Sequence, residues 1–210
     1  MVARVVVLAG PSGAGKSRLA QRSGLPVLRL DDFYRSAGDP ALPLVTDGPN
    51  PSRRLVPRLL RTGAGIVDWD HPDSWLPAEA LAAMERLCAG GRAEVPVYDI
   101  GRSTRTGSHV LDLAGSPLVV AEGIFAADVV AACRERGLLA AAFCVTQRPT
   151  VTFARRLHRD LRERRKPPLV LLRRGLALWR DQRRVVAHAV AAGCEPLTGD
   201  QGLRRIRALS

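Results

Sequence analysis

The chain has 210 residues, of which 46% are hydrophobic, and it carries a formal net charge of +12 at pH 7. This length suits one domain with a substantial core, and no apolar run approaches the roughly 20 residues that a membrane-spanning helix needs. Because the first residues are predicted to form a core strand and not a charged and apolar leader, we expect a soluble cytoplasmic protein.

The positive charge is concentrated near one end of the chain. Residues 148–210 contain 16 Arg or Lys and 5 Asp or Glu, so they carry +11 of the net charge. A basic segment attracts polyanions, and both ATP and nucleic acids belong to this class. Aromatic residues form only 4% of the chain, and none alternates with these arginines. The composition therefore argues against a stacking surface for nucleic-acid bases.

The first predicted elements are a strand, a glycine-rich loop and a helix. The apolar run at residues 3–9 predicts a buried strand. An α-helix has unpaired N–H groups and partial positive charge at its N-terminus, so a loop that leads into a helix from Lys16 to Arg22 favours a bound phosphate. The loop matches the pattern G-x-x-x-x-G-K-S and is formed by Gly10, Pro11, Ser12, Gly13, Ala14, Gly15, Lys16 and Ser17.

This loop predicts ATP and Mg²⁺ as the cofactors. Lys16 is placed to reach the β- and γ-phosphates, and the Ser17 hydroxyl is placed to ligate Mg²⁺. Lysine occurs only at positions 16 and 166, whereas the chain otherwise uses arginine for its basic residues. A compact ammonium is therefore required at the loop, where a planar guanidinium would not serve the same role.

A second apolar segment, residues 26–30, predicts a short strand that ends in two carboxylates, Asp31 and Asp32. Ligands bind at the carboxyl ends of strands in open parallel sheets. We expect one carboxylate to accept a proton from a substrate hydroxyl and the other to hold the water shell of the metal. A solvated turn is the alternative interpretation of such an acidic pair.

The middle of the chain alternates irregular and regular segments. Residues 36–66 are rich in Pro, Gly and Arg and have little periodicity, so we expect a surface excursion that leans over the substrate. An apolar stripe of helical spacing between Pro77 and Gly90 predicts a helix. Residues 95–100 and 108–113 predict two strands joined by a basic loop, which together form a hairpin-like flap at about 94–113.

A buried strand is predicted at residues 117–121, and it ends in Glu122. A carboxylate at the end of a strand opposite a phosphate loop is the usual place for the acid that orients Mg²⁺, and a structural salt bridge is the competing interpretation. A helix at 126–136 and a strand at 138–145 are expected to follow.

An arginine-rich helix begins at Pro149 and carries one apolar face. Lys166-Pro167-Pro168 must break this helix, so we expect an arm at about 155–175 that closes over ATP as a lid. A purely solvated basic face is the alternative. A last helical region is expected from Leu176 to Ala192, and no second domain boundary is apparent, so residues 1–210 are expected to form a single domain.

Six short motifs resemble those of the uridine kinase family of P-loop kinases, which also includes relatives of phosphoribulokinase. The phosphate loop is similar to the family's G-x-S-G-x-G-K-S/T, and Asp31-x-Phe33-Tyr34 is similar to its D-x-F-Y. Asp70-His71-Pro72-Asp73 resembles F-D-H-P-D with Trp69 in place of Phe, and Pro96-Val97-Tyr98-Asp99 resembles P-x-Y-D. Glu122-Gly123-Ile124 matches E-G-I, and Arg156-x-x-Arg159-Asp160-x-x-x-Arg164 resembles the lid's R-x-x-R-D-x-x-x-R.

The resemblance implies an α/β fold, a P-loop NTPase of three αβα layers with a mostly parallel sheet, a small β flap and an arginine-rich lid. It implies phosphoryl transfer from ATP to the 5′-hydroxyl of a nucleoside, a small-molecule alcohol. Asp31 would be the base, Asp70 would hold ribose hydroxyls, and Tyr98 would contact the nucleobase. The full set of expected site residues is Lys16, Asp31 and Arg159 for catalysis; the phosphate loop with Arg159 and Arg164 for ATP; Asp31, Tyr34, Trp69, Asp70, Tyr98, Arg105 and Arg156 for the acceptor; and Ser17, Asp32 and Glu122 for Mg²⁺.

Departures from the family pattern leave the acceptor open. The family's pyrimidine kinases have a His that falls on Ser103, although the following Arg is kept as Arg105. The alternative is therefore a P-loop kinase of another small alcohol, such as a sugar phosphate, a pantothenate-like acid or a modified nucleoside. A third possibility from a different class is an RNA-binding ATPase, whose hydrolysis RNA would stimulate. The sequence does not decide between ATP and GTP, or whether the chain forms homo-oligomers.

Overall fold

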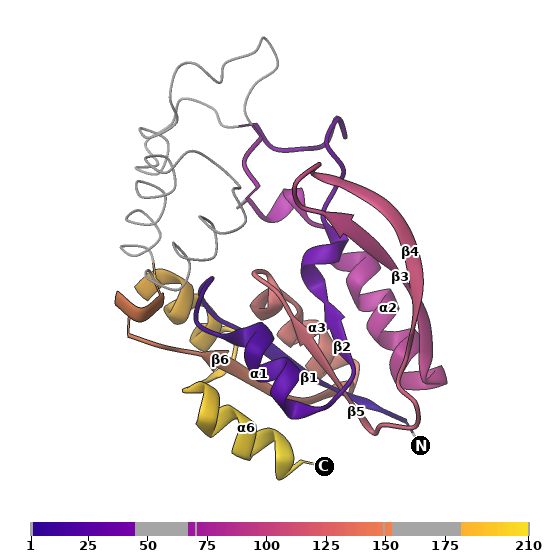
Figure 1. Ribbon diagram of the computed structural model, residues 1–210. Helices are drawn as coiled ribbons and strands as arrows, with labels where there is room; N and C mark the ends of the chain where they lie inside the picture. Colours follow the sequence, from indigo (N-terminus) through magenta and orange to yellow (C-terminus); the bar gives the residue numbers. More distant parts are fainter. Residues whose placement is uncertain (1, 45–66, 70, 149, 153–181, 210) are drawn as a thin grey trace.

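The computed structural model describes residues 2–44, 67–69, 71–148, 150–152 and 182–209 (Figure 1). The expected lid at about 155–175 and most of the expected excursion at 36–66 lie outside these described residues.

The centre of the molecule is a five-stranded sheet with the order β2-β5-β1-β6-β7, in which all neighbouring strands are parallel. Parallel sheets are covered on both faces, which explains why the strands read as continuous apolar runs such as Val5-Val6-Val7-Leu8. The expected parallel sheet is confirmed. Its strands are β1 (Arg4–Ala9), β2 (Val27–Arg29), β5 (Leu118–Glu122), β6 (Leu139–Val145) and β7 (Glu195–Leu197).

Two hydrophobic clusters form on the two faces of the sheet, so the fold has three layers. Val5 and Val7 of β1 point into one cluster with Met84 of α2, whereas Val6 and Leu8 point into the other. This alternation follows from the two-residue period of a strand. The helical elements are α1 (Lys16–Ser23), η1 (Leu30–Phe33), η4 (Pro72–Ser74), α2 (Pro77–Gly90), η5 (Ala126–Val129), α3 (Val130–Glu135), a helix over residues 182–191, and α6 (Gly199–Arg207).

The flap is a separate two-stranded antiparallel sheet beside β2 and α2 (Figure 1). It consists of β3 (Arg92–Asp99) and β4 (Thr104–Asp112), which are longer than the strands that the sequence predicts. A β-bulge interrupts the pairing between Val97 and Tyr98. The hairpin is therefore confirmed, but with a shorter connection and an irregularity that its sequence did not indicate.

The last strand and helix were not predicted from the sequence. β7 pairs with β6, and α6 packs Leu203 and Ile206 into the same cluster as Leu19 of α1. α6 begins with a capping box in which Thr198 and Gln201 bond to each other's backbone N–H groups. Within the described segments, every helix is too short or too polar to cross a membrane.

Candidate active site

The phosphate loop connects the end of β1 to the start of α1, and its shape depends on glycine. Gly10, Gly13 and Gly15 have φ angles of 128°, 87° and 101°, a region that favours residues without a Cβ atom. At Gly10, a Cβ atom would lie only 2.5 Å from the carbonyl oxygen of Val145. The loop therefore passes close to the end of β6, and only glycine fits there.

Lys16 is buried, with 9% of its surface exposed, and its side chain folds back over the loop. Its Nζ donates hydrogen bonds to the carbonyl oxygens of Gly10, at 2.7 Å, and of Pro11, at 3.3 Å. The ammonium charge is thus held against the loop, where a phosphate would compete with these two carbonyls for it.

Ser17 and Glu122 bring oxygen atoms together beside this loop. Ser17 Oγ donates a hydrogen bond to Glu122 Oε1 at 2.9 Å, which joins the first turn of α1 to the end of β5. Burial raises the pKa of Glu122, and the Lys16 ammonium and the Ser17 hydroxyl partly oppose this shift.

This pair has the chemistry of a partial magnesium site. Among the described residues, no group of three or more His, Cys, Asp or Glu forms a metal cage. Mg²⁺ in nucleotide enzymes is commonly held by one or two protein oxygens together with substrate phosphates and waters. The hydroxyl of Ser17 and the carboxylate of Glu122 fit that pattern.

Asp31 and Asp32 are adjacent in η1 but contact different parts of the molecule. Asp31 Oδ1 accepts a hydrogen bond from the backbone N–H of Ile124 at 3.0 Å, in the turn that follows β5. Asp32 Oδ1 accepts one from the backbone N–H of Tyr98 in the flap at 3.3 Å. Burial raises the pKa of Asp32, while the Tyr98 N–H and the charge of Arg29 partly oppose this shift.

Gly123 allows Asp31 to approach the end of β5. A Cβ atom at Gly123 would lie 2.8 Å from both Asp31 Oδ1 and Leu30 Cβ. The electrostatic effect of Asp31 also contributes to the raised pKa of Glu122. The structure therefore brings together Lys16, Ser17, Asp31 and Glu122, which come from three neighbouring strand ends.

An aromatic cluster surrounds Tyr34, which directly follows η1. The ring centroid of Tyr34 lies 6.0 Å from that of Trp69, 5.7 Å from that of Tyr98 and 5.8 Å from that of Phe125. Burial raises the pKa of Tyr98 to about 12, so its phenol remains protonated at neutral pH, and it donates to the Arg35 carbonyl at 3.2 Å. Phe125 was missed by the sequence analysis, although its place directly after the E-G-I motif was a signal.

Arg105 connects the flap to the rest of the molecule. Its Nη2 lies 2.8 Å from Glu79 Oε2 of α2, and its Nε donates to the Tyr34 carbonyl at 3.3 Å. The neighbouring Ser103 has a φ angle of 51°, and its carbonyl accepts a hydrogen bond from Ala37 N–H. Both contacts fix the flap next to the η1 loop. A contact between Arg105 and the phosphoryl acceptor stays a prediction.

Four expected site residues lie outside the described part of the chain. They are Asp70, Arg156, Arg159 and Arg164. Their roles toward the acceptor and ATP therefore stay predictions.

Comparisons with known proteins identify kinases as sequence relatives. No family model matches the chain. It is 26% identical over 168 residues to a uridine kinase of Schizosaccharomyces pombe, covering 77% of this chain and 32% of that protein. It is 24% identical over 171 residues to a uridine kinase of Lactobacillus helveticus, covering 76% and 69%.

A third relative differs in its named activity. The chain is 30% identical over 127 residues to the inorganic pyrophosphatase TTM2 of Arabidopsis thaliana, covering 58% of this chain and 15% of that protein. The chain thus spans a third or less of the length of two of these curated relatives.

A solved structure supports the fold. A putative fructose transport system kinase from Silicibacter sp. TM1040 matches with a TM-score of 0.57 and 19% identity, over 88% of this chain and 85% of that chain. The uridine kinase relatives, the parallel sheet and the phosphate loop agree with one another. The chain is similar in sequence to uridine kinases, and its fold is that of a P-loop kinase.

Proposed function

We propose that this protein is a small-molecule kinase, which transfers the γ-phosphoryl group of ATP to a hydroxyl group of its acceptor. The observation that carries the proposal is the hydrogen bond between Ser17 and Glu122, which lies beside the phosphate loop and the Asp31 carboxylate. A site for phosphoryl transfer needs a phosphate cradle, a metal position and a base, and these residues supply one group for each need.

Each residue has a distinct part in this proposal. Lys16 and the loop N–H groups would bind the β- and γ-phosphates, and Ser17 and Glu122 would hold Mg²⁺. When bound there, Mg²⁺ would neutralise negative charge on the phosphate oxygens. As the bond from the acceptor oxygen to phosphorus forms, the bond from phosphorus to the departing ADP oxygen breaks, and the acceptor proton passes to the Asp31 carboxylate.

The first acceptor to test is the 5′-hydroxyl of a nucleoside. The aromatic cluster of Tyr34, Trp69, Tyr98 and Phe125 supports this choice, because aromatic rings pack against flat bases and against sugar rings. Tyr34, Trp69 and Tyr98 also belong to the motifs that resemble those of uridine kinases. The nucleoside specificity therefore rests on the resemblance and on this cluster.

A second candidate is a kinase of a different small alcohol. Ser103 stands where the family's pyrimidine kinases have His, and the Arg105 guanidinium lies against Glu79. Both observations weaken the case for direct reading of a uracil or cytosine ring. They favour an acceptor that keeps the hydroxyl group but lacks the pyrimidine.

An ADP-release screen tests the proposal. The acceptors are uridine, cytidine, other nucleosides, ribulose 5-phosphate and pantothenate, with the Lys16→Ala variant as the blank. We expect acceptor-dependent ADP release by the wild type and none by the variant. ADP release that ignores every acceptor and rises with added RNA would instead support the RNA-binding ATPase.

A further inference from the structure

A cleft of 480 Å³ lies between the flap, α1 and the edge strand β2. Ser17, Asp32 and Glu122 line it, so it adjoins the candidate active site. Val27, Val95 and Val97 contribute apolar surface. This volume is within the range of about 300–1,000 Å³ that is usual for small-molecule sites, which combine apolar walls with a few polar groups.

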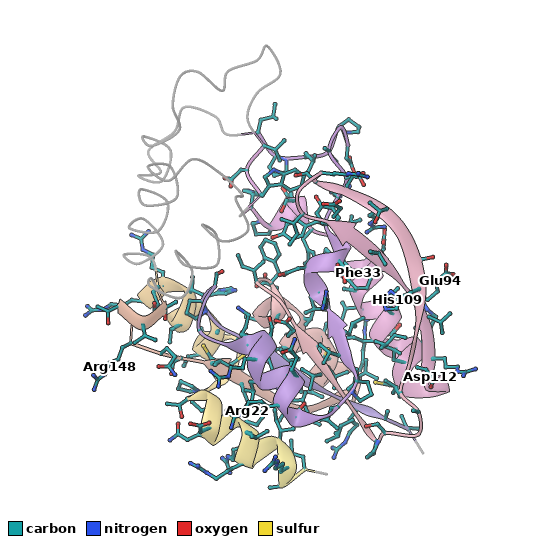
Figure 2. All side chains as sticks on the ribbon, in the orientation of Figure 1. Arg22, Phe33, Glu94, His109, Asp112 and Arg148 are labelled. Carbon is teal, nitrogen blue, oxygen red and sulfur yellow. The ribbon has the colours of Figure 1, made fainter. Side chains whose placement is uncertain are left out.

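Two groups able to bind anions, Arg29 and His109, line the same cleft. Arg29 is the register partner of Glu122 in the sheet, and His109 comes from β4 of the flap (Figure 2). The carboxylate of Glu122 nevertheless bonds to Ser17 and forms no ion pair with Arg29. The charges of both Arg29 and His109 act on Asp32, where they oppose the effect of burial on its pKa.

Arg29 differs from the arginines of the flap. Within the described segments, neither Arg29 nor His109 has an ion pair or a side-chain hydrogen bond. Each flap arginine, in contrast, has a carboxylate partner: Arg92 pairs with Asp112, Arg102 with Asp99, and Arg105 with Glu79. A guanidinium that faces a cleft and forms no ion pair there is suited to a bidentate contact with a phosphate or a carboxylate.

We propose that this cleft binds the acceptor through a negatively charged group, which Arg29 and His109 hold while the acceptor hydroxyl lies toward Ser17 and Glu122. The inference rests on the proposed kinase function and narrows its acceptor class. The substrate is then an alcohol that carries a phosphate or a carboxylate, and an uncharged nucleoside lacks the group that the cleft recognises.

Anion binding at the cleft is measured on the full chain by histidine NMR. The protein is saturated with Mg²⁺ and a non-hydrolysable ATP analogue, so that the γ-phosphate position is filled, and is titrated with inorganic phosphate or with acetate. His109→Gln identifies the His109 signal among the four histidines. We expect a saturable shift of that signal, and at least about tenfold weaker binding in Arg29→Gln. Arg86→Gln, which changes an exposed arginine of α2 outside the cleft, is the control.

Kinetics with matched acceptors distinguish the two kinds of anion. Ribulose 5-phosphate is compared with ribulose, and pantothenate with panthenol. We expect the charged member of one pair to have the higher kcat/KM by about tenfold or more, and Arg29→Gln to remove this preference without changing the KM for ATP.

The possible outcomes are separable. If the ATP analogue does not bind in calorimetry, the proposed function fails. If the analogue binds but the His109 signal does not respond to either anion, or responds equally in Arg29→Gln, the proposed function survives and this inference is wrong. Phosphorylation of uncharged nucleosides with undiminished kcat/KM in Arg29→Gln and in His109→Gln also contradicts it.

Discussion

At the residue scale, Asp31 is held by the Ile124 N–H at the edge of the sheet next to Glu122. Asp31→Asn keeps an oxygen that accepts this hydrogen bond but removes the base. We expect kcat to fall by about 10²- to 10⁴-fold, while the affinity for ATP stays nearly constant. Steady-state kinetics and calorimetry measure the two quantities, and Asp32→Asn is the matched control. Full activity of Asp31→Asn would exclude the carboxylate as the base.

Gly123 is required by the close approach of Asp31. The Cβ atom of Gly123→Ala would lie 2.8 Å from two neighbours, so the variant must displace the η1 loop. We expect a loss of about 1–3 kcal/mol in the free energy of unfolding, measured by urea denaturation, together with reduced turnover. In the control Gly90→Ala, the new Cβ atom meets nothing within 4 Å and should cost no stability. Equal stability of the two variants would contradict this view of the turn.

The buried carboxylate of Glu122 is expected to lower the stability of the protein while it supports activity. Its pKa is raised by burial, so the folded protein binds this proton more tightly than the unfolded chain does. The contribution of Glu122 to stability is therefore lost as the pH rises from the ordinary glutamate pKa through the raised one. We expect Glu122→Gln to raise the melting temperature at pH 7 relative to wild type and to lose this advantage at acid pH. The variant should also have weakened Mg²⁺-dependent activity, and a melting temperature below wild type at pH 7 would contradict the argument.

At the element scale, the flap is attached to the site by a hydrogen bond between Tyr98 of β3 and Asp32 of η1. The pairing of β3 with β4 is irregular between Val97 and Tyr98, and the backbone N–H of Tyr98 donates to Asp32 at this point. Asp32→Ala leaves this donor without its partner, whereas Asp32→Asn keeps an acceptor oxygen. We expect Asp32→Ala to raise the acceptor KM by about tenfold and Asp32→Asn to restore it, both with unchanged Mg²⁺ dependence. Loss of Mg²⁺ dependence in both variants would instead support the predicted metal role of Asp32.

The sequence predicted the elements whose signals are local. The apolar run before the phosphate loop identified β1, and the helix expected from Lys16 to Arg22 is found as α1, which ends one residue later at Ser23. β7 was missed because it has three residues, Glu195–Leu197, and is defined only by its pairing with β6. α6 did have a readable signal, since Thr198 and Gln201 have the spacing of a capping box.

The candidate site also contains some contacts that the sequence predicts and others that depend on packing between distant segments. The approach of Asp31 to Glu122 follows from the sequence, because parallel strands place their carboxyl ends at one edge of the sheet. The contact of Asp32 with the flap could not be predicted, since it depends on how β3 packs beside η1, and these segments are far apart in the sequence. The attachment of Arg105 to Glu79 likewise depends on how the flap packs against α2.

At the scale of the whole molecule, the chain combines a three-layer fold with an uneven distribution of charge along the sequence. The phosphate loop, Asp31 and Glu122 all lie at the carboxyl ends of β1, β2 and β5. The excess of positive charge in residues 148–210 suits a polyanionic cosubstrate such as ATP. A kinase and an RNA-stimulated ATPase share this charge, and the fate of the γ-phosphoryl group separates them most directly.

The most direct measurement follows that group. γ-Labelled ATP and Mg²⁺ are incubated with the wild type, Lys16→Ala and Asp31→Asn in the presence of the nucleoside and acid-bearing acceptors named above. The account predicts that the wild type transfers the label to a small-molecule phosphate ester, that Lys16→Ala forms none, and that Asp31→Asn forms it much more slowly. Label that appears only as inorganic phosphate, at a rate independent of every acceptor, would contradict it.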